Sequence, residues 1–210
     1  MQEQRPITLY ILAIVLVEAL VVLIVATPSF IAESKKSERE GLVWLLGDVG
    51  ANDAARFSKK YFKAHFLDTD IRDLSYDVFI PTQNKKERAN LENFVPTFFE
   101  AAKRRFDGWW MMIEGAYTRV YTIVQIILIF MIAIIGAVVD GISRRGAAIA
   151  KKEHSVPVYY HAAKRAFLLL ALLPIFILLW PVSVHPVVWL TWGLCIPAAL
   201  WVSFRNVQEL

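Results

Sequence analysis

Four stretches of this sequence contain almost no charged residues and are close to the length that crosses a lipid bilayer. They are Ile7–Phe30, Val120–Val139, Ala166–Trp180 and Val187–Phe204. An α-helix rises about 1.5 Å per residue, so about 20 apolar residues cross the roughly 30 Å hydrocarbon core. Hydrophobic residues make up 57% of the 210 residues and charged residues 20%, which is more apolar than an ordinary soluble domain. The sequence therefore predicts an all-α membrane protein with four transmembrane helices.

The first apolar stretch has two interpretations, a cleaved signal peptide or a permanent anchor. Its core from Leu9 to Ala26 is almost unbroken. Signal-peptide cores are usually about 7–15 residues long, so this one is too long. The residues around Pro28 match a cleavage site only in part. We interpret residues 1–30 as an uncleaved N-terminal transmembrane anchor.

Residues 31–117 carry most of the charge and predict a mostly helical domain outside the bilayer. The region opens with the run ESKKSERE at residues 33–40, which we expect to be solvated. Aromatic residues then recur four apart, in the pairs Phe57/Tyr61 and Phe62/Phe66, so each pair can stack along a helix. The single cysteine, Cys195, allows no internal disulfide, so this domain must fold without one.

Two further elements are predicted in this domain. Apolar residues from Leu91 to Phe106 recur at helical spacing, and Pro96 would fit in the first turn of that amphipathic helix. Residues Leu74–Thr82 alternate in the manner of a β-strand, which Pro81 would end.

The second apolar stretch combines an aromatic approach with a face of small residues. The aromatic and apolar residues expected in an interfacial belt are Trp109, Trp110, Met111, Met112, Ile113, Tyr117 and Tyr121. Ala133, Ala137 and Gly141 recur every four residues, with Gly136 beside them, and such spacing lets two helices approach closely. We favour packing on another helix of the same chain over self-dimerisation, although a homo-oligomer stays open.

Charge distribution predicts the orientation. The polar loop 140–165 carries six basic residues against Asp140 and Glu153, whereas residues 31–117 carry 14 basic and 14 acidic residues. Short loops rich in Lys and Arg stay in the cytoplasm, while long loops translocate largely regardless of charge. We therefore expect loop 140–165 and both termini on the cytoplasmic side of the membrane and residues 31–117 on the opposite side. Three basic residues near the second apolar stretch oppose this orientation: Lys103, Arg104 and Arg105. They are outnumbered by the six basic residues of loop 140–165.

The sequence offers no recognisable catalytic or metal site. It has no phosphate-binding glycine loop, dinucleotide fingerprint or G-x-S-x-G motif, and its four histidines have no metal-ligand spacing. We expect no cofactor, no metal and no enzymatic activity. The basic loop could attract DNA or anionic lipid, but the same charges are already required to set the topology, so we expect no direct nucleic-acid binding.

Several residues are instead candidates for contact with another subunit. Glu18 is an ionisable residue inside an apolar stretch, where a carboxyl group usually faces protein and finds a partner. The full set of predicted contact residues is Glu18, Ala133, Ala137, Asp140, Gly141, Arg144, Arg145, Lys151, Lys152 and His161.

The second half of the chain resembles a known family of membrane proteins. The residues that carry the resemblance are Trp109, Trp110 and Tyr117, then Val139, Asp140 and Gly141, the pair Arg144 and Arg145, and then Ser155, Pro157, His161 and Ala163, followed by an apolar hairpin with prolines. This pattern is similar to that of membrane proteins of integrative conjugative elements and conjugative plasmids, which share a domain of unknown function and include the coupling-protein-associated membrane protein of H-type plasmids.

The resemblance implies a role in conjugation. We expect a non-catalytic accessory of a type IV secretion system in a bacterial inner membrane, acting beside the coupling ATPase or another subunit. In that membrane, residues 31–117 would lie in the periplasm. One alternative is an exclusion protein that acts in the recipient and blocks uptake of a redundant plasmid. A second alternative is a small-molecule transporter or membrane enzyme that depends on Glu18.

Overall fold

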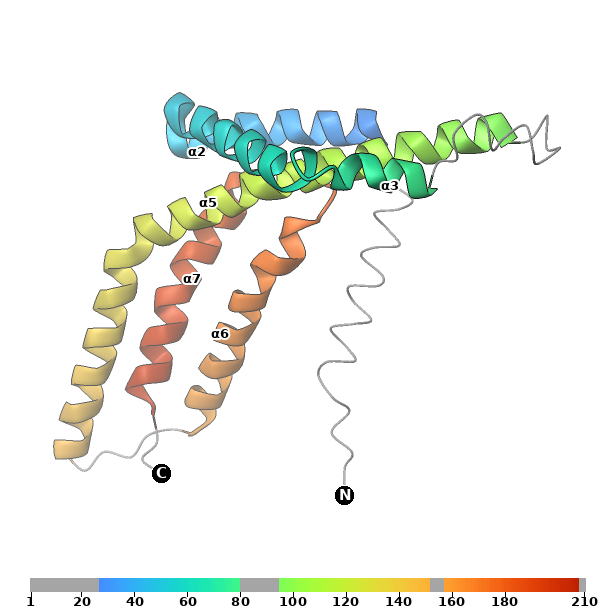
Figure 1. The fold of residues 1–210 in the computed structure, drawn as a ribbon. Coiled ribbons are helices and arrows are strands. Elements are labelled where there is room, and N and C mark those ends of the chain that lie inside the picture. Colours follow the sequence, from blue (N-terminus) through green and yellow to red (C-terminus); the bar gives the residue numbers. More distant parts are fainter. Residues whose placement is uncertain (1–26, 80–94, 152–156, 208–210) are drawn as a thin grey trace, which may run out of the picture. The chain divides into compact units, whose positions relative to one another are not determined.

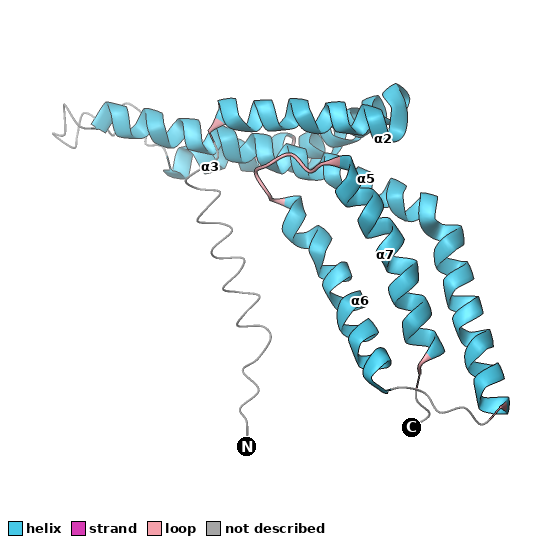
Figure 2. Cartoon of the chain, turned by 180° about the vertical axis from the view of Figure 1, so that it is seen from behind, coloured by secondary structure: helices cyan, strands magenta, loops and turns pink. Residues whose placement is uncertain are grey.

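The computed structural model describes residues 27–79, 95–151 and 157–207, and these residues are helical apart from short connections. The elements are α2 (Pro28–Phe62), the π-helical turn η1 (Lys63–Leu67), α3 (Ile71–Phe79), α5 (Val95–Ala150), α6 (Pro157–Leu178) and α7 (Pro186–Arg205) (Figure 1). No strand occurs in this part of the chain (Figure 2). The all-helical fold predicted from the sequence is confirmed.

The chain divides into two compact units. Unit 1 contains the described residues of Met1–Arg119 together with Leu178–Ser183, and unit 2 contains those of Val120–Ile177 and Val184–Leu210. The inclusion of Leu178–Ser183 in unit 1 was not predicted, because these residues span the end of the third apolar stretch and the connection after it.

Helix α2 of unit 1 is a hairpin of two helical arms that reverses at Gly47. Gly47 has φ 72° and ψ 175°, a conformation that residues with a Cβ rarely adopt. The two arms run side by side in both views (Figures 1 and 2). Across the turn, Arg39 Nη2 donates a hydrogen bond of 3.1 Å to Asn52 Oδ1. The glycine therefore makes two arms out of what would otherwise be one long helix.

Aromatic and apolar residues of α5 pack against this hairpin. Ile31 and Met112 form a buried cluster with Trp109 and Met111 packed around it. Trp110 is 9% exposed and contacts the rings of Phe62 and Phe66 edge-on. The interfacial-belt interpretation is therefore wrong for Trp110 and Met112, which are core residues of unit 1.

The expected aromatic pairs of α2 and η1 are present. The rings of Phe57 and Tyr61 lie 4.4 Å apart and those of Phe62 and Phe66 lie 5.6 Å apart, measured between centroids. Helix α5 begins at Val95, so Pro96 lies in its first turn as predicted.

The predicted strand at Leu74–Thr82 is wrong over its described residues, because Ile71–Phe79 form helix α3. Tyr76 and Phe79, three residues apart, both contact the ring of Phe106 on α5. On a helix these two side chains share one face, and no partner strand lies in the described residues to support the alternative. The short run of alternating residues was compatible with either structure, and packing against α5 selected the helix.

Unit 2 contains apolar helices whose side chains are largely exposed. Three described helical segments are long and apolar enough to cross a membrane: Glu100–Ala150, Val158–Leu178 and Pro186–Arg205. Ile132, for example, is 83% exposed. Apolar surface of this extent is what lipid would cover. The remaining predicted span, at residues 7–30, lies mostly outside the described residues and stays a prediction.

Close packing between α5 and α7 takes place at glycines. A Cβ added to Gly193 would lie 2.5 Å from Cδ2 of Phe130 and 2.9 Å from Cγ2 of Ile126. A Cβ added to Gly141 would lie 3.1 Å from the carbonyl oxygen of Trp201. The preference for packing within the chain is therefore confirmed for Gly141.

The polar loop predicted at 140–165 is wrong in most of its length. Helix α5 continues through Asp140 to Ala150, and α6 begins at Pro157. The residues after Asp140 include Ala147, Ala148 and Ala150, which are strong helix formers, so the change from apolar to polar side chains does not end the helix. The basic residues therefore lie mainly on helical ends rather than on a loop.

Candidate functional site

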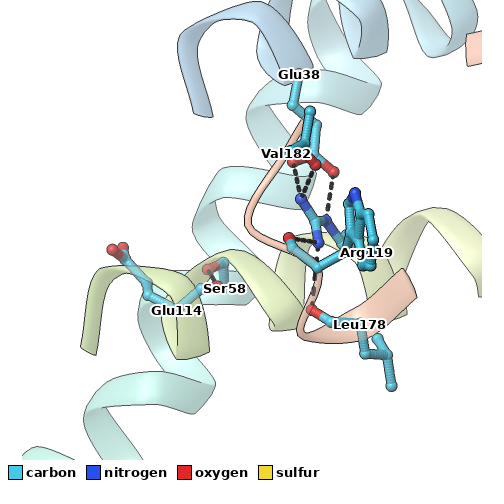
Figure 3. Close-up of polar contacts among 7 residues, drawn as sticks. Glu38, Ser58, Glu114, Arg119, Leu178 and Val182 are labelled. Atoms are coloured by element: carbon cyan, nitrogen blue, oxygen red, sulfur yellow. Dashed lines mark hydrogen bonds and ion pairs between the residues drawn. The ribbon is translucent and has the colours of Figure 1, made fainter. Parts of the chain in front are cut away.

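The most connected polar group in unit 1 is the guanidinium of Arg119 on α5. Its Nε donates to Oε1 of Glu38 at 2.8 Å and its Nη2 donates to Oε2 at 2.9 Å, which makes a two-pronged ion pair (Figure 3). The side chains of Arg119 and Glu38 are only 5% and 8% exposed. The planar guanidinium matches the two carboxylate oxygens, a geometry that lysine cannot reproduce.

The same guanidinium also binds the segment between α6 and α7. Nη1 donates to the carbonyl oxygens of Trp180 at 2.5 Å and Leu178 at 3.4 Å, and Nη2 donates to that of Val182 at 3.0 Å. Leu178 is the last residue of α6, where a helix presents carbonyl groups without helical partners and favours a positive charge. Arg119 therefore joins α2, α5 and the segment Leu178–Ser183 within unit 1. We call this set of contacts the Arg119 clamp.

The burial of Glu38 corrects the expectation that residues 33–40 are a solvated charge run. Ile31, Ser34, Glu38 and Leu42 are all buried, at 2%, 8%, 7% and 4% exposure. Their spacing of three or four residues places them on one face of α2, and that face packs inward. A polar residue in step with an apolar stripe was the signal that could have identified Glu38.

A second polar group joins the same helices next to the clamp. Lys35 Nζ donates to Oε2 of Glu114 at 2.6 Å. Ser58 Oγ donates to the backbone carbonyl of Glu114 at 2.6 Å, and Figure 3 shows these two residues close together. Lys35 and Ser58 belong to different arms of α2. Glu114 and its carbonyl group therefore hold both arms against α5.

A cleft of about 350 Å³ lies between the two arms of α2 and α5, beside these contacts. Its charged lining residues are Lys35, Lys36, Arg39, Lys59, Glu38 and Glu114. Its other lining residues are Ala32, Leu42, Ala51, Ala55, Ser58, Gly115 and Thr118. The cleft combines basic residues with small or apolar ones, and because these come from three separate helical segments, no local sequence motif marks it.

A tyrosine on α3 is held in its neutral form. Tyr76 Oη donates a short hydrogen bond to Oδ1 of Asp107 on α5. Burial, and after it the hydrogen bond to the Asp107 carboxylate, raise the pKa of Tyr76 to about 12, because both disfavour the phenolate.

In unit 2, three of the residues predicted to contact another subunit instead contact α7 of the same chain: Gly141, which packs closely on it, and Asp140 and Arg144. Asp140 Oδ2 accepts hydrogen bonds from Trp201 Nε1 at 2.6 Å and from Arg144 Nε at 2.7 Å. The guanidinium groups of Arg144 and Arg205 lie over the Trp201 ring, 5.8 and 5.0 Å from its centroid. Asp140 and Arg144 thus have a structural role at the end of α5.

The other predicted contact residues are not brought together into one site. Ala133, Lys151 and His161 are exposed, and Ala137 and Arg145 are half-buried. Glu18 and Lys152 lie outside the described residues. Within the ranges that the structure describes, no group of three His, Cys, Asp or Glu side chains is placed to hold a metal ion.

Comparison with known proteins decides the family. Residues 25–208 match the family described as IncC plasmid conjugative DNA transfer protein DtrJ-like. The chain belongs to this family. The matched residues include described parts of both compact units, so family membership does not rest on the apolar helices alone. No curated protein and no solved structure matches the chain. The resemblance to proteins of conjugative elements is confirmed, and the protein takes part in conjugative DNA transfer.

Proposed function

We propose that this protein is a non-catalytic inner-membrane accessory of a conjugative type IV secretion apparatus, and that it contacts the coupling ATPase that delivers DNA to the channel. The observation that carries the proposal is the match of residues 25–208 to a family of conjugative DNA transfer proteins. The three long apolar helices support a position in the membrane. The absence of nucleotide-binding motifs from the sequence favours a scaffold over a motor.

The C-terminal end of α5 is the surface that we assign to the cytoplasmic partner. Arg145 and Lys151 lie there, with Lys152 directly after them in the sequence. Arg144 is a poorer candidate, because it already pairs with Asp140 and covers Trp201. Replacing Arg144 would disturb unit 2 as well as any partner contact.

A pull-down in detergent tests the contact. The double variant Lys151→Gln/Lys152→Gln keeps the Arg144–Asp140 pair, and we expect it to reduce capture of the coupling ATPase by about tenfold, since each exposed charge in complementary contact contributes on the order of 1 kcal/mol. The larger variant with Arg144 and Arg145 also replaced should reduce capture further. The matched control is Lys103→Gln/Arg104→Gln, which removes the same charge from exposed positions elsewhere on α5. Unchanged capture together with unchanged DNA transfer would count against the proposal.

A mating experiment separates the accessory role from exclusion. An accessory is required in the donor, so deleting the gene there should abolish transfer, and expression in the recipient should have no effect. If transfer instead falls when the protein is made only in the recipient, the exclusion hypothesis replaces the proposal.

A further inference from the structure

We propose that the cleft between the arms of α2 and α5 binds the phosphate headgroup of an anionic phospholipid. This proposal concerns a lipid ligand of unit 1 and does not depend on the protein partner proposed above.

The charges around the cleft leave a surplus of cations. Lys36, Arg39 and Lys59 line it from both arms of α2, and none of them forms an ion pair with another described residue. The acidic lining residues do not neutralise these cations. Glu38 is paired with Arg119 and Glu114 with Lys35. Cations that converge without a counter-ion favour an anionic ligand.

The walls of the cleft leave room for a ligand that is more than a bare ion. Gly115 of α5 is a lining residue, and a Cβ added to it would meet nothing within 4 Å. Ala32, Ala51 and Ala55 are lining residues with small side chains, and Leu42 adds an apolar surface. A basic rim over small and apolar walls suits a phosphate group with an uncharged glycerol moiety attached.

The position of the cleft along the chain favours a lipid over a nucleic acid. Glu114, Gly115 and Thr118 line it, and the apolar stretch that begins at Val120 follows directly on the same helix. At about 1.5 Å per residue, at most roughly 9 Å of helix separates them from that stretch. Basic groups at the edge of a membrane span meet anionic headgroups. Helix α2 as a whole carries six basic and five acidic residues, which is not the continuous basic surface that a nucleic acid requires.

The test uses the full-length protein in a neutral detergent. Its thermal unfolding is followed during titration with short-chain phosphatidylglycerol, short-chain phosphatidylcholine, or inorganic phosphate, because a ligand that binds the folded state raises the unfolding temperature. We expect phosphatidylglycerol to raise it in a saturable way and the other two probes to have little effect.

Matched charge variants localise the binding. Lys36→Gln/Arg39→Gln/Lys59→Gln should weaken apparent phosphatidylglycerol affinity by at least about tenfold, given the contribution of each cation near an anionic headgroup. The control Arg56→Gln/Lys60→Gln/Lys63→Gln removes the same charge from exposed positions that do not line the cleft, and should change affinity less than about twofold.

A cleft-filling variant keeps the test decisive if the triple variant does not fold. Gly115→Leu retains every charge and places a side chain in open space, and it should weaken binding as the triple variant does. Gly136→Leu, also in open space, is its control. Equal responses to the two lipids, an equal response to inorganic phosphate, equal losses in the two charge variants, or full binding by Gly115→Leu would each overturn the proposal.

Discussion

At the scale of single residues, Arg119 is the group on which the polar contacts of unit 1 converge. Its side chain donates hydrogen bonds to the buried carboxylate of Glu38 and to three backbone carbonyl groups between residues 178 and 182. These two parts of the sequence are far apart. Removing one partner of a buried ion pair typically costs about 3–5 kcal/mol, because the other charge is left buried without compensation.

We predict that Arg119→Met lowers the free energy of unfolding by about 3–5 kcal/mol, measured by thermal unfolding in detergent. The double variant Glu38→Met/Arg119→Met removes both charges and should recover only part of this loss, since the carbonyl groups of Leu178, Trp180 and Val182 lose their donor. Full recovery would show that the carbonyl contacts contribute nothing. Arg56→Gln breaks the exposed pair with Asp53 and should cost less than about 1 kcal/mol.

Tyr76 gives a prediction in pH. Its pKa is raised from 10.0 to about 12, so folding favours the protonated phenol. The stabilisation from this group is therefore complete below pH 10 and is lost as the pH rises from about 10 to about 12. Tyrosinate absorbance is measured against pH for the wild type and for Tyr76→Phe. The difference between the two titration curves reports Tyr76 and should have its midpoint near pH 12. A midpoint near 10 would contradict the contact with Asp107.

At the scale of elements, α5 and α7 pack closely because Gly141 and Gly193 have no side chain to separate them. Helices in a membrane associate through close packing rather than through the hydrophobic effect, so small residues at their contact are important. Gly193 meets Ile126, which is fully buried, and Phe130. The spacing of the small residues on α5 was visible in the sequence, whereas Gly193 is a single glycine on α7 with no such pattern around it.

We predict that Gly193→Ala destabilises the protein by about 1–3 kcal/mol, the usual cost of overpacking, measured as a lower unfolding temperature in detergent. Gly136→Ala is the control, because a Cβ there meets nothing within 4 Å. It should be neutral or slightly stabilising, since alanine has the higher helix propensity. Equal effects of the two substitutions would indicate that α5 and α7 do not pack at Gly193.

At the scale of the whole molecule, the orientation in the membrane follows from charge alone and stays a prediction. A reporter enzyme that is active only in the periplasm should be inactive when fused near Gly146 and active when fused at Asn84, because the basic segment after α5 is expected to stay in the cytoplasm. The opposite pattern would reverse the orientation and remove the basis for contact with a cytoplasmic ATPase. Fusions at both positions should be checked for equal expression.

The sequence alone determined the properties that depend on composition and local order. Long uncharged stretches predicted apolar helices, the spacing of Phe57/Tyr61 and Phe62/Phe66 predicted helical stacking, and the quoted motifs indicated the conjugative family. Each of these signals is carried by residues close together in the chain, so no knowledge of distant contacts was required.

The tertiary structure decided what depends on residues far apart in the chain. Glu38 looked like one member of a solvated charge run until the position of Arg119, 81 residues later, showed it to be buried. The sequence of residues 74–79 was compatible with a strand or a helix, and the packing of Tyr76 and Phe79 on Phe106 selects the helix. The cleft depends on the reversal at Gly47, which brings Lys59 of one arm to the same cavity as Lys36 and Arg39 of the other. A charge that is costly to bury can only be assigned to the interior when its partner is known, and that partner is a property of the fold.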